Sequence, residues 1–176
     1  MLFDFFYLIL ELKKIPRSGW KNKVGIEHPE SVADHSYSTA IMAMLFSDIK
    51  NLNTEKMIKM ALIHDLAESI TGDFTPNEIS KENKITIENE VVKDLLLKLP
   101  PASAEQYSII WREFQEGKTD ESKLIHDVDR LEMAIQATKY LSEGYPKEKL
   151  QEFIESAKRE IKSKDILEIL DTISYK

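Results

Sequence analysis

The sequence predicts an all-α protein, and three observations support that fold class. Only five of the 176 residues are glycine. No stretch alternates apolar and polar residues for long enough to indicate a sheet strand. The segment 123–140 instead repeats apolar residues at helical spacing. The length is that of one domain, on the usual figure of roughly 100–200 residues per domain. No linker or repeat divides the chain, so we expect a single domain over residues 1–176.

The first predicted helix covers residues 2–14 and ends before Pro16, since the residue before a proline disfavours the helical conformation. This apolar segment carries Asp4 and Glu11 and has no basic leader. It is also shorter than the roughly 20 apolar residues that cross a membrane. We therefore expect a core helix in a cytoplasmic protein that does not insert into membranes.

The second helix is predicted from its capping residues. Ser31 and Asp34 form a pair similar to a capping box, and they open a helix that runs to about residue 50. Thr54 can cap a third helix over residues 55–69, and residues 71–76 then form a loop. Further helices are expected over residues 84–98, 102–116 and 120–143, with one or two terminal helices over residues 147–175.

Composition excludes several function classes. The net charge of −7 argues against broad binding of nucleic acid polymers, which requires Lys and Arg to neutralise phosphates. A local basic cluster could nevertheless hold a small anion, or be an ordinary solvated surface; it comprises Lys13, Lys14, Arg17, Lys21 and Lys23. Because the chain has no cysteine, any metal site must use His, Asp and Glu, which suit borderline or hard divalent ions.

The predicted helix over residues 55–69 carries the strongest chemical signal. Apolar residues cover nearly its whole circumference, which predicts a buried helix, yet it also contains His64, Asp65 and Glu68. Isolated buried charges cost several kcal/mol each unless they are paired or bind a metal. At this spacing the three side chains can converge on one patch. A buried His–Asp pair that only orients the helix remains the alternative.

Two further residues are candidates for the same site. His35 lies in the first turn of the helix that Ser31 caps, and Asp129 lies beside the apolar stripe of segment 123–140. Taken alone, Asp129 would be a solvated helix charge. Together with His64 and Asp65, these residues would hold one divalent ion and leave positions open for water and a phosphate oxygen, as catalytic metal sites do.

The ordered set of motifs resembles the HD-domain superfamily of metal-dependent phosphohydrolases, and within it the small single-domain branch that includes 5′-deoxynucleotidases. The matching blocks occur in family order over residues 2–140: Leu12–Trp20, Pro29–Ser36, Ala61–Glu68, Thr71–Asp73 and Asp127–Met133. A His–Asp dipeptide alone would be weak evidence, but the ordered set is specific. The resemblance implies an HD-domain helical bundle with its metal-site core at about residues 30–140.

The resemblance also implies roles for individual residues. The family's metal ligands match His35, His64, Asp65 and Asp129, which would hold one divalent ion: manganese, cobalt, iron, nickel, zinc or magnesium. Glu68 matches the acid that activates or orients the attacking water. Arg17 and Trp20 match a substrate-side pair, here separated by two residues, and Asp73 matches a loop acid that faces the sugar. Family members are commonly homodimers.

The activity implied is hydrolysis of deoxyribonucleoside 5′-monophosphates to deoxynucleoside and phosphate. One alternative is another HD phosphohydrolase, acting on nucleoside triphosphates, cyclic nucleotides or guanosine polyphosphates. A second is a non-catalytic, metal-dependent nucleotide-binding protein. His126, three residues before Asp129, suggests a second metal, although we interpret it as a sequence variation.

Overall fold

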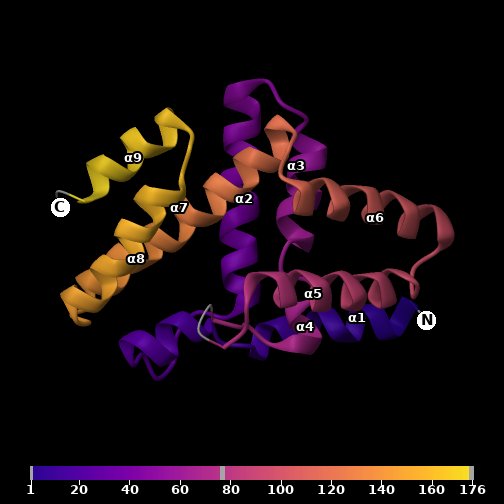
Figure 1. The fold of residues 1–176 in the computed structure, drawn as a ribbon, viewed down its shortest axis with the longest axis horizontal. Coiled ribbons are helices and arrows are strands. Elements are labelled where there is room, and N and C mark those ends of the chain that lie inside the picture. The colour runs from indigo at the N-terminus through magenta and orange to yellow at the C-terminus, as the bar shows by residue number, and fades with distance from the viewer. Residues whose placement is uncertain (1, 76–77, 175–176) are drawn as a thin grey trace.

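The computed structural model describes residues 2–75 and 78–174, and within them nearly all regular structure is helical (Figure 1). The elements are α1 (Leu2–Glu11), the 3₁₀ turn η1 (Leu12–Lys14), the π-helical turn η2 (Trp20–Val24), α2 (Val32–Lys50), α3 (Thr54–Ile63), α4 (Glu68–Thr71), α5 (Lys81–Leu96), α6 (Pro101–Glu116), α7 (Asp120–Ser142), α8 (Lys147–Glu160) and α9 (Lys164–Ser174). No strand occurs among these residues, and Pro16 and Ser31 form an isolated bridge. The predicted all-α class is confirmed.

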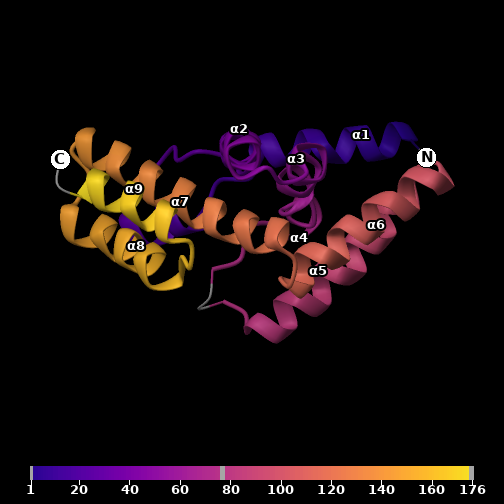
Figure 2. The same ribbon diagram turned by 90° about the horizontal axis from the view of Figure 1, so that it is seen from above.

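Helices α2, α3 and α7 form the centre of the molecule. α2 packs against α3, and α7 crosses α2 and continues to the side where it packs against α8 and α9. Helices α5 and α6 lie on the opposite side of the centre (Figures 1 and 2). The junction of α2, α3 and α7 is therefore enclosed by helices on both sides.

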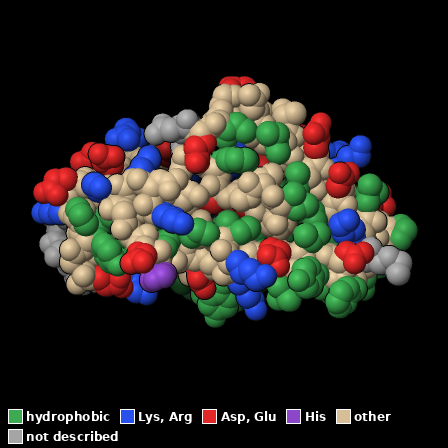
Figure 3. All heavy atoms as spheres, turned by 90° about the horizontal axis from the view of Figure 1, so that it is seen from below, with side chains coloured by type: hydrophobic (Ala, Val, Ile, Leu, Met, Phe, Trp, Pro, Cys, Tyr) green, Lys and Arg blue, Asp and Glu red, His purple; other side chains and the backbone are tan. Residues whose placement is uncertain are grey.

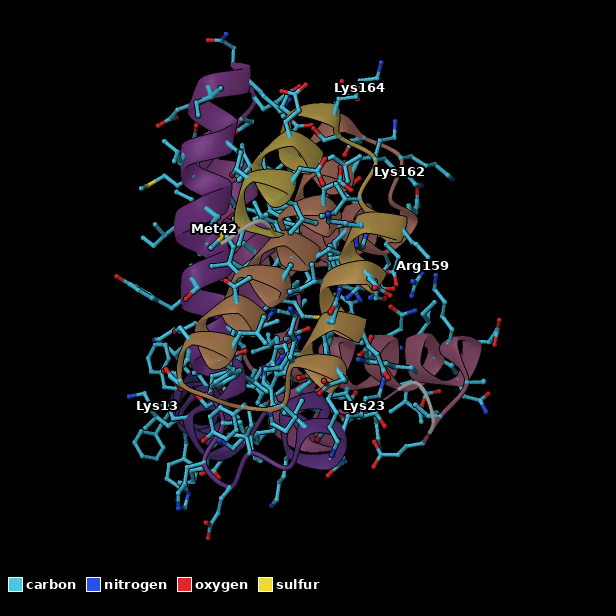
Figure 4. The ribbon with its side chains drawn as sticks, turned by 90° about the vertical axis from the view of Figure 1, so that its left-hand side faces the viewer. Lys13, Lys23, Met42, Arg159, Lys162 and Lys164 are labelled. Atoms are coloured by element: carbon cyan, nitrogen blue, oxygen red, sulfur yellow. The ribbon has the colours of Figure 1, made fainter. Side chains whose placement is uncertain are left out.

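One apolar core extends through this arrangement. Its fully buried side chains include Met57 and Met60 of α3, Leu131 of α7 and Leu150 of α8. In the view of Figure 4, α8 and α9 lie against α7, while Arg159, Lys162 and Lys164 project outward from the α8–α9 end. The amphipathic pattern thus places apolar residues inward and charged residues in solvent.

Helix starts follow the capping chemistry that the sequence suggested, with one correction. The Ser31 hydroxyl accepts a bond from the Asp34 amide at 3.2 Å, and the Asp34 carboxylate accepts one from the Ser31 amide at 2.9 Å, which confirms the capping box. The prediction that Thr54 caps the next helix is wrong by one residue. Asn53 is the cap, because its side-chain oxygen accepts a bond from the Lys56 amide at 3.0 Å.

The predicted continuous helix over residues 55–69 is also wrong. α3 ends at Ile63, a turn follows over residues 64–67, and the short α4 begins at Glu68. In this turn the Leu66 and Glu68 amides donate to carbonyl groups three residues earlier, at 3.1 and 3.0 Å. Adjacent side chains diverge on a regular α-helix. The tighter turn over residues 64–67 instead changes the directions in which the side chains of His64 and Asp65 point.

The expectation of a core helix at the N-terminus is wrong as well. No residue of α1 is buried, since the helix packs on one side only, against α4 and a small cluster around Leu66 and Leu95. Figure 3 shows hydrophobic side chains gathered along the edge that α1 occupies. None of the described helices is long and apolar enough to span a membrane. The predicted loop residue Pro76 and the predicted helix end at Tyr175 lie outside the described residues.

The cap assignment can be tested by comparing two neighbouring substitutions. We expect Asn53→Ala to lower the free energy of unfolding by about 1 kcal/mol, because the Lys56 amide loses its acceptor. Thr54→Ala should cost less, about 0.5 kcal/mol or under, because it removes only a solvent-exposed hydrogen bond from the Thr54 hydroxyl to the Asp48 carboxylate. Urea denaturation followed by circular dichroism measures both. An equal or larger loss for Thr54→Ala would restore the sequence-based assignment.

Candidate metal centre

Four of the predicted site residues meet where α2, α3 and α7 come together. His35 lies in the first turn of α2, and Asp129 lies in α7. His64 and Asp65 occupy the tight turn after α3. His35 and His64 are almost completely buried. The turn that breaks the predicted helix therefore brings two consecutive residues to the same point.

Ligand atoms of His35, His64 and Asp129 lie within 4.8 Å of one another, as one cation requires, and a carboxylate oxygen of Asp65 approaches both imidazoles. Nε2 of His35 lies 3.3 Å from Nε2 of His64 and 3.1 Å from Oδ1 of Asp129. Oδ2 of Asp65 lies 3.3 Å from Nε2 of His64 and 3.7 Å from Nε2 of His35. An ion with bonds of about 2.0–2.2 Å separates its ligand atoms by roughly 3–4.4 Å. The donor set, two imidazoles and two carboxylates, fits a borderline or hard divalent ion.

A hydrogen bond at Nδ1 orients each of the two imidazoles. Nδ1 of His35 lies 2.6 Å from Oε2 of Glu132, and Nδ1 of His64 lies 2.6 Å from the carbonyl oxygen of Ala61. When each ring is neutral, its acceptor fixes the proton on Nδ1, so that Nε2 carries the lone pair that a metal ion needs. Metal-binding histidines usually have such partners, which set the ring orientation and raise basicity.

The charges in this cluster stabilise one another. Burial raises the pKa of the Asp129 carboxyl, but Arg130 and the hydrogen bond from His35 outweigh it and hold that pKa well below its usual value. The pKa of Asp65 is also lowered, since His64 and Arg17 outweigh its burial. Both carboxylates are therefore ionised. In the ion-free protein, burial and Arg17 oppose protonation of His35, yet Asp129 and Glu132 raise its pKa to about 10.

Arg17 and Asp73 border the cluster on one side. Nη1 of Arg17 lies 3.4 Å from Oδ2 of Asp65 and 3.7 Å from Oδ1 of Asp73. Asp73 also accepts a bond from the Ser18 amide at 2.6 Å. The Arg17 amide donates to the Glu30 carbonyl oxygen at 3.0 Å, and this bond fixes the Arg17 segment beside the start of α2. A guanidinium is thus held next to the imidazole and carboxylate cluster.

Glu68 opens α4 and is fully buried. Its Oε1 lies 3.3 Å from Nζ of Lys84, while its Oε2 has no hydrogen-bond partner among the described residues. Burial raises the pKa of this carboxyl well above its usual value, and the charges of Asp65 and Asp73 raise it further. A buried carboxyl with one unengaged oxygen can accept or deliver a proton.

Trp20 does not lie among these groups. It is 2% exposed and packs in the core, with its ring centroid 4.3 Å from that of Phe153. Its indole N–H donates to Oε1 of Glu30 at 2.7 Å. The structure therefore places Trp20 behind the Arg17 segment, as part of its support.

The predicted basic cluster is divided in the structure. Arg17 faces inward, whereas Lys13 and Lys23 are exposed and project from different parts of the surface (Figure 4). Lys14 pairs with Glu11 at 2.8 Å, and Lys23 lies 5.4 Å from the centroid of the Phe153 ring. The lysines form an ordinary solvated surface, and Arg17 alone faces the candidate site.

Among the described residues, His126 is not part of a cluster of possible metal ligands. Its Nε2 lies 3.0 Å from the Phe114 carbonyl oxygen at the end of α6, and its ring stacks on Phe114 with centroids 4.5 Å apart. These contacts give it a structural role in joining α7 to α6.

Some residues that contact the site were missed by the sequence analysis, among them Glu132 and Lys84. Glu132 follows Asp129 by three residues, a spacing that places both on one face of α7, and this was the available signal. Lys84 reaches Glu68 from α5, sixteen residues away in the chain. No local spacing predicts such a contact, so only the packing of α5 could reveal it.

The chain is similar to known proteins in both sequence and structure. The sequence matches the HD domain family over residues 9–169. A protein of Dictyostelium discoideum named 5′-deoxynucleotidase HDDC2 is 38% identical over 88% of this chain and 87% of its own length. The human protein of the same name is 33% identical over 98% of this chain and 84% of its own. A crystal structure of a Pyrococcus horikoshii protein superposes with a TM-score of 0.81, at 32% identity over 97% of both chains.

The role of Glu132 can be tested through metal affinity. We expect Glu132→Ala to weaken divalent-ion binding by about 10- to 100-fold, because His35 loses the partner that orients its ring. Isothermal titration of the chelator-treated protein with Mn²⁺ measures the change. Asp120→Asn, at an exposed carboxylate on the same helix, serves as the control. Unchanged affinity in Glu132→Ala would contradict the assignment.

Proposed function

We propose how the site works from the premise that this chain belongs to the HD-domain family of metal-dependent phosphohydrolases. The chain is a phosphoric monoester hydrolase, a 5′-deoxynucleotidase that converts deoxyribonucleoside 5′-monophosphates to deoxynucleoside and phosphate. The observation that carries the proposed mechanism is the convergence of two imidazoles and two carboxylates beside a partly buried arginine.

In our proposal, His35, His64, Asp65 and Asp129 hold one divalent ion. Support comes from the interatomic distances, from the partners that leave both Nε2 atoms available, and from the ionised state of the two carboxylates. When bound, the ion supplies a Lewis acid that lowers the pKa of water and offsets negative charge on phosphoryl oxygens. Manganese, cobalt, iron, nickel, zinc and magnesium are all compatible with a nitrogen and oxygen donor set.

Glu68 is proposed to handle the proton of the attacking water. As the water oxygen bonds to phosphorus and the bond from phosphorus to O5′ breaks, Glu68 takes the water proton and later releases it to solvent, while the departing O5′ takes one proton from solvent. The unpartnered Oε2 and the raised pKa of this carboxyl support that role. General acid–base catalysis of this kind contributes about 10²- to 10⁴-fold in rate.

Arg17 is proposed to bind the phosphate. Its planar guanidinium suits two-point contact with phosphoryl oxygens, and it already lies beside Asp65. Asp73 borders the same space and is proposed to face the sugar. Trp20 supports the Arg17 segment from the core, through its hydrogen bond to Glu30, and does not contact the proposed substrate space directly. Its effect on deoxyribose selection would therefore be indirect.

We also propose that two copies of the chain form a homodimer through an apolar surface made by α1 and α2. The exposed apolar residues of this surface are Phe3, Phe6, Tyr7, Leu10, Tyr37, Ile41, Met44, Leu45 and Ile49. Phe3 is 75% exposed and Leu45 is 57% exposed. Both helices lie along one side of the molecule (Figure 2). An apolar patch of this extent indicates an interaction site, and an apolar surface complements a second copy of itself.

Free nucleotides are the proposed partners, rather than nucleic acid polymers or membranes, in keeping with the net charge of −7. We place the protein in the cytoplasm on the same basis, because its substrates are free nucleotides.

The activity is tested by phosphate release from a panel of 2′-deoxy- and ribonucleoside 5′-monophosphates. We expect faster release from the deoxy substrates, loss of activity after chelation, and recovery when a divalent ion is restored. Asp129→Ala should abolish both turnover and tight metal binding. Full turnover with one bound ion in that variant would contradict the four-ligand assignment. No release with any ion would favour a nucleotide-binding protein.

The dimer is tested with a charge placed in the proposed interface. We expect the wild type to be dimeric and Ile41→Glu to be monomeric, because a carboxylate would be buried without a partner. Size-exclusion chromatography with light scattering measures the mass. Ile109→Glu, at an exposed apolar residue of α6, should leave the dimer intact. A monomeric wild type would assign this surface to a different partner.

A further inference from the structure

Lys84 is the only basic side chain within 4.0 Å of Glu68 among the described residues, and it comes from a different helix. It lies on the first turn of α5, after the loop that carries Asp73. Its Nζ lies 3.3 Å from Oε1 of Glu68 and 3.4 Å from Oε1 of Glu88. The side chain is 32% exposed, whereas that of Glu68 is completely buried. The ammonium group therefore reaches inward from the surface to a buried carboxyl.

The two oxygens of Glu68 are in different situations. Oε1 is engaged by Lys84, and Oε2 has no partner among the described residues. A lysine that held both oxygens would compete with any proton transfer. A carboxyl with no partner at all would be free to rotate about its last bond. Engagement of one oxygen orients the group and leaves the other available.

Glu88 fixes the lysine in turn. It lies one helical turn after Lys84 on α5 and is largely buried. With a carboxyl on each side, the Nζ atom is held between α4 and α5. The contact with Glu68 thus depends on the packing of two helices.

We propose that Lys84 is a positioning residue for the hydrolysis, which holds Oε1 of Glu68 so that Oε2 faces the attacking water. The inference deepens the proposed function and rests on it, since it assumes that Glu68 handles the proton. Lys84 acts through Glu68 and does not itself touch the reacting atoms.

The charges around Glu68 predict how the pH profile responds. Burial and the carboxylates of Asp65 and Asp73 raise the pKa of Glu68, whereas Arg17 and Lys84 lower it. When Lys84 is removed, one of the two cations that lower the pKa of Glu68 is lost and Arg17 remains, so the pKa of Glu68 rises. A base acts when it is deprotonated, and the acidic limb of the activity profile must therefore move to higher pH.

The experiment compares Lys84→Met, Lys84→Arg and the control Lys81→Met, an exposed lysine one turn earlier on α5. All are loaded with the same divalent ion and assayed on the deoxynucleotide that the wild type hydrolyses fastest. We expect Lys84→Met to lower kcat by about tenfold or more, as part of the rate that a positioned base supplies. KM and metal content should be unchanged, and the acidic limb should move upward. Lys84→Arg should recover most of the rate, and Lys81→Met should match the wild type.

A second measurement does not depend on turnover. Carbon-13 NMR of protein labelled at the glutamate carboxyls, with Glu68→Gln used for assignment, follows the titration of Glu68 directly. We expect its midpoint to rise in Lys84→Met and to stay near the wild-type value in Lys84→Arg. Thermal unfolding of each variant shows whether the fold is retained.

Three results would overturn the proposal. A raised KM with unchanged kcat would make Lys84 a substrate ligand. Wild-type kinetics in Lys84→Met would show that Lys84 has no role in the hydrolysis. Equal losses in Lys84→Met and Lys84→Arg, with an unmoved Glu68 titration, would indicate packing alone. A wild type that hydrolyses nothing refutes the proposed function instead, and the NMR titration still reports whether Lys84 sets the state of Glu68.

Discussion

Burial of ionisable side chains at the junction of α2, α3 and α7 is the constraint on which the structure depends. Each uncompensated buried charge costs several kcal/mol, and this junction contains two imidazoles and several carboxylates. The protein offsets that cost by assigning partners: Glu132 to His35, the Ala61 carbonyl to His64, and Arg17 to Asp65. The remaining lone pairs converge on one point, where a divalent ion would complete the compensation.

Two local departures from regular helix make this convergence possible. The tight turn after Ile63 directs both His64 and Asp65 to the same place, which a continuous α-helix does not allow for adjacent residues. The isolated bridge between Pro16 and Ser31 holds the Arg17 segment against the start of α2, where His35 lies. The site is therefore built where the chain interrupts its helices, while the long helices supply rigid support.

The chemistry and the proposed association surface lie on different parts of the same scaffold. The face of α1 that is not exposed packs against α4, the short helix that begins with Glu68. The apolar residues of the proposed association surface are exposed, so they are not buried in that contact. Association of two copies would thus cover apolar surface without obstructing the ligand cluster, and it would support α4 from behind.

The sequence by itself determined the fold class, the extents of α5 to α7 within a few residues, and the capping box of Ser31 and Asp34, because these depend on local periodicity and local hydrogen bonds. It also identified His64, Asp65 and Glu68 as candidates, since charged residues in an apolar helix require an explanation, and the resemblance of the ordered motifs to a family added weight to His35 and Asp129. Tertiary structure alone decided the break after Ile63, the exposure of α1 and the core position of Trp20. It alone revealed the contact between Lys84 and Glu68. These features depend on which elements meet across the fold, and on whether a helix is covered on both sides, which no local spacing encodes.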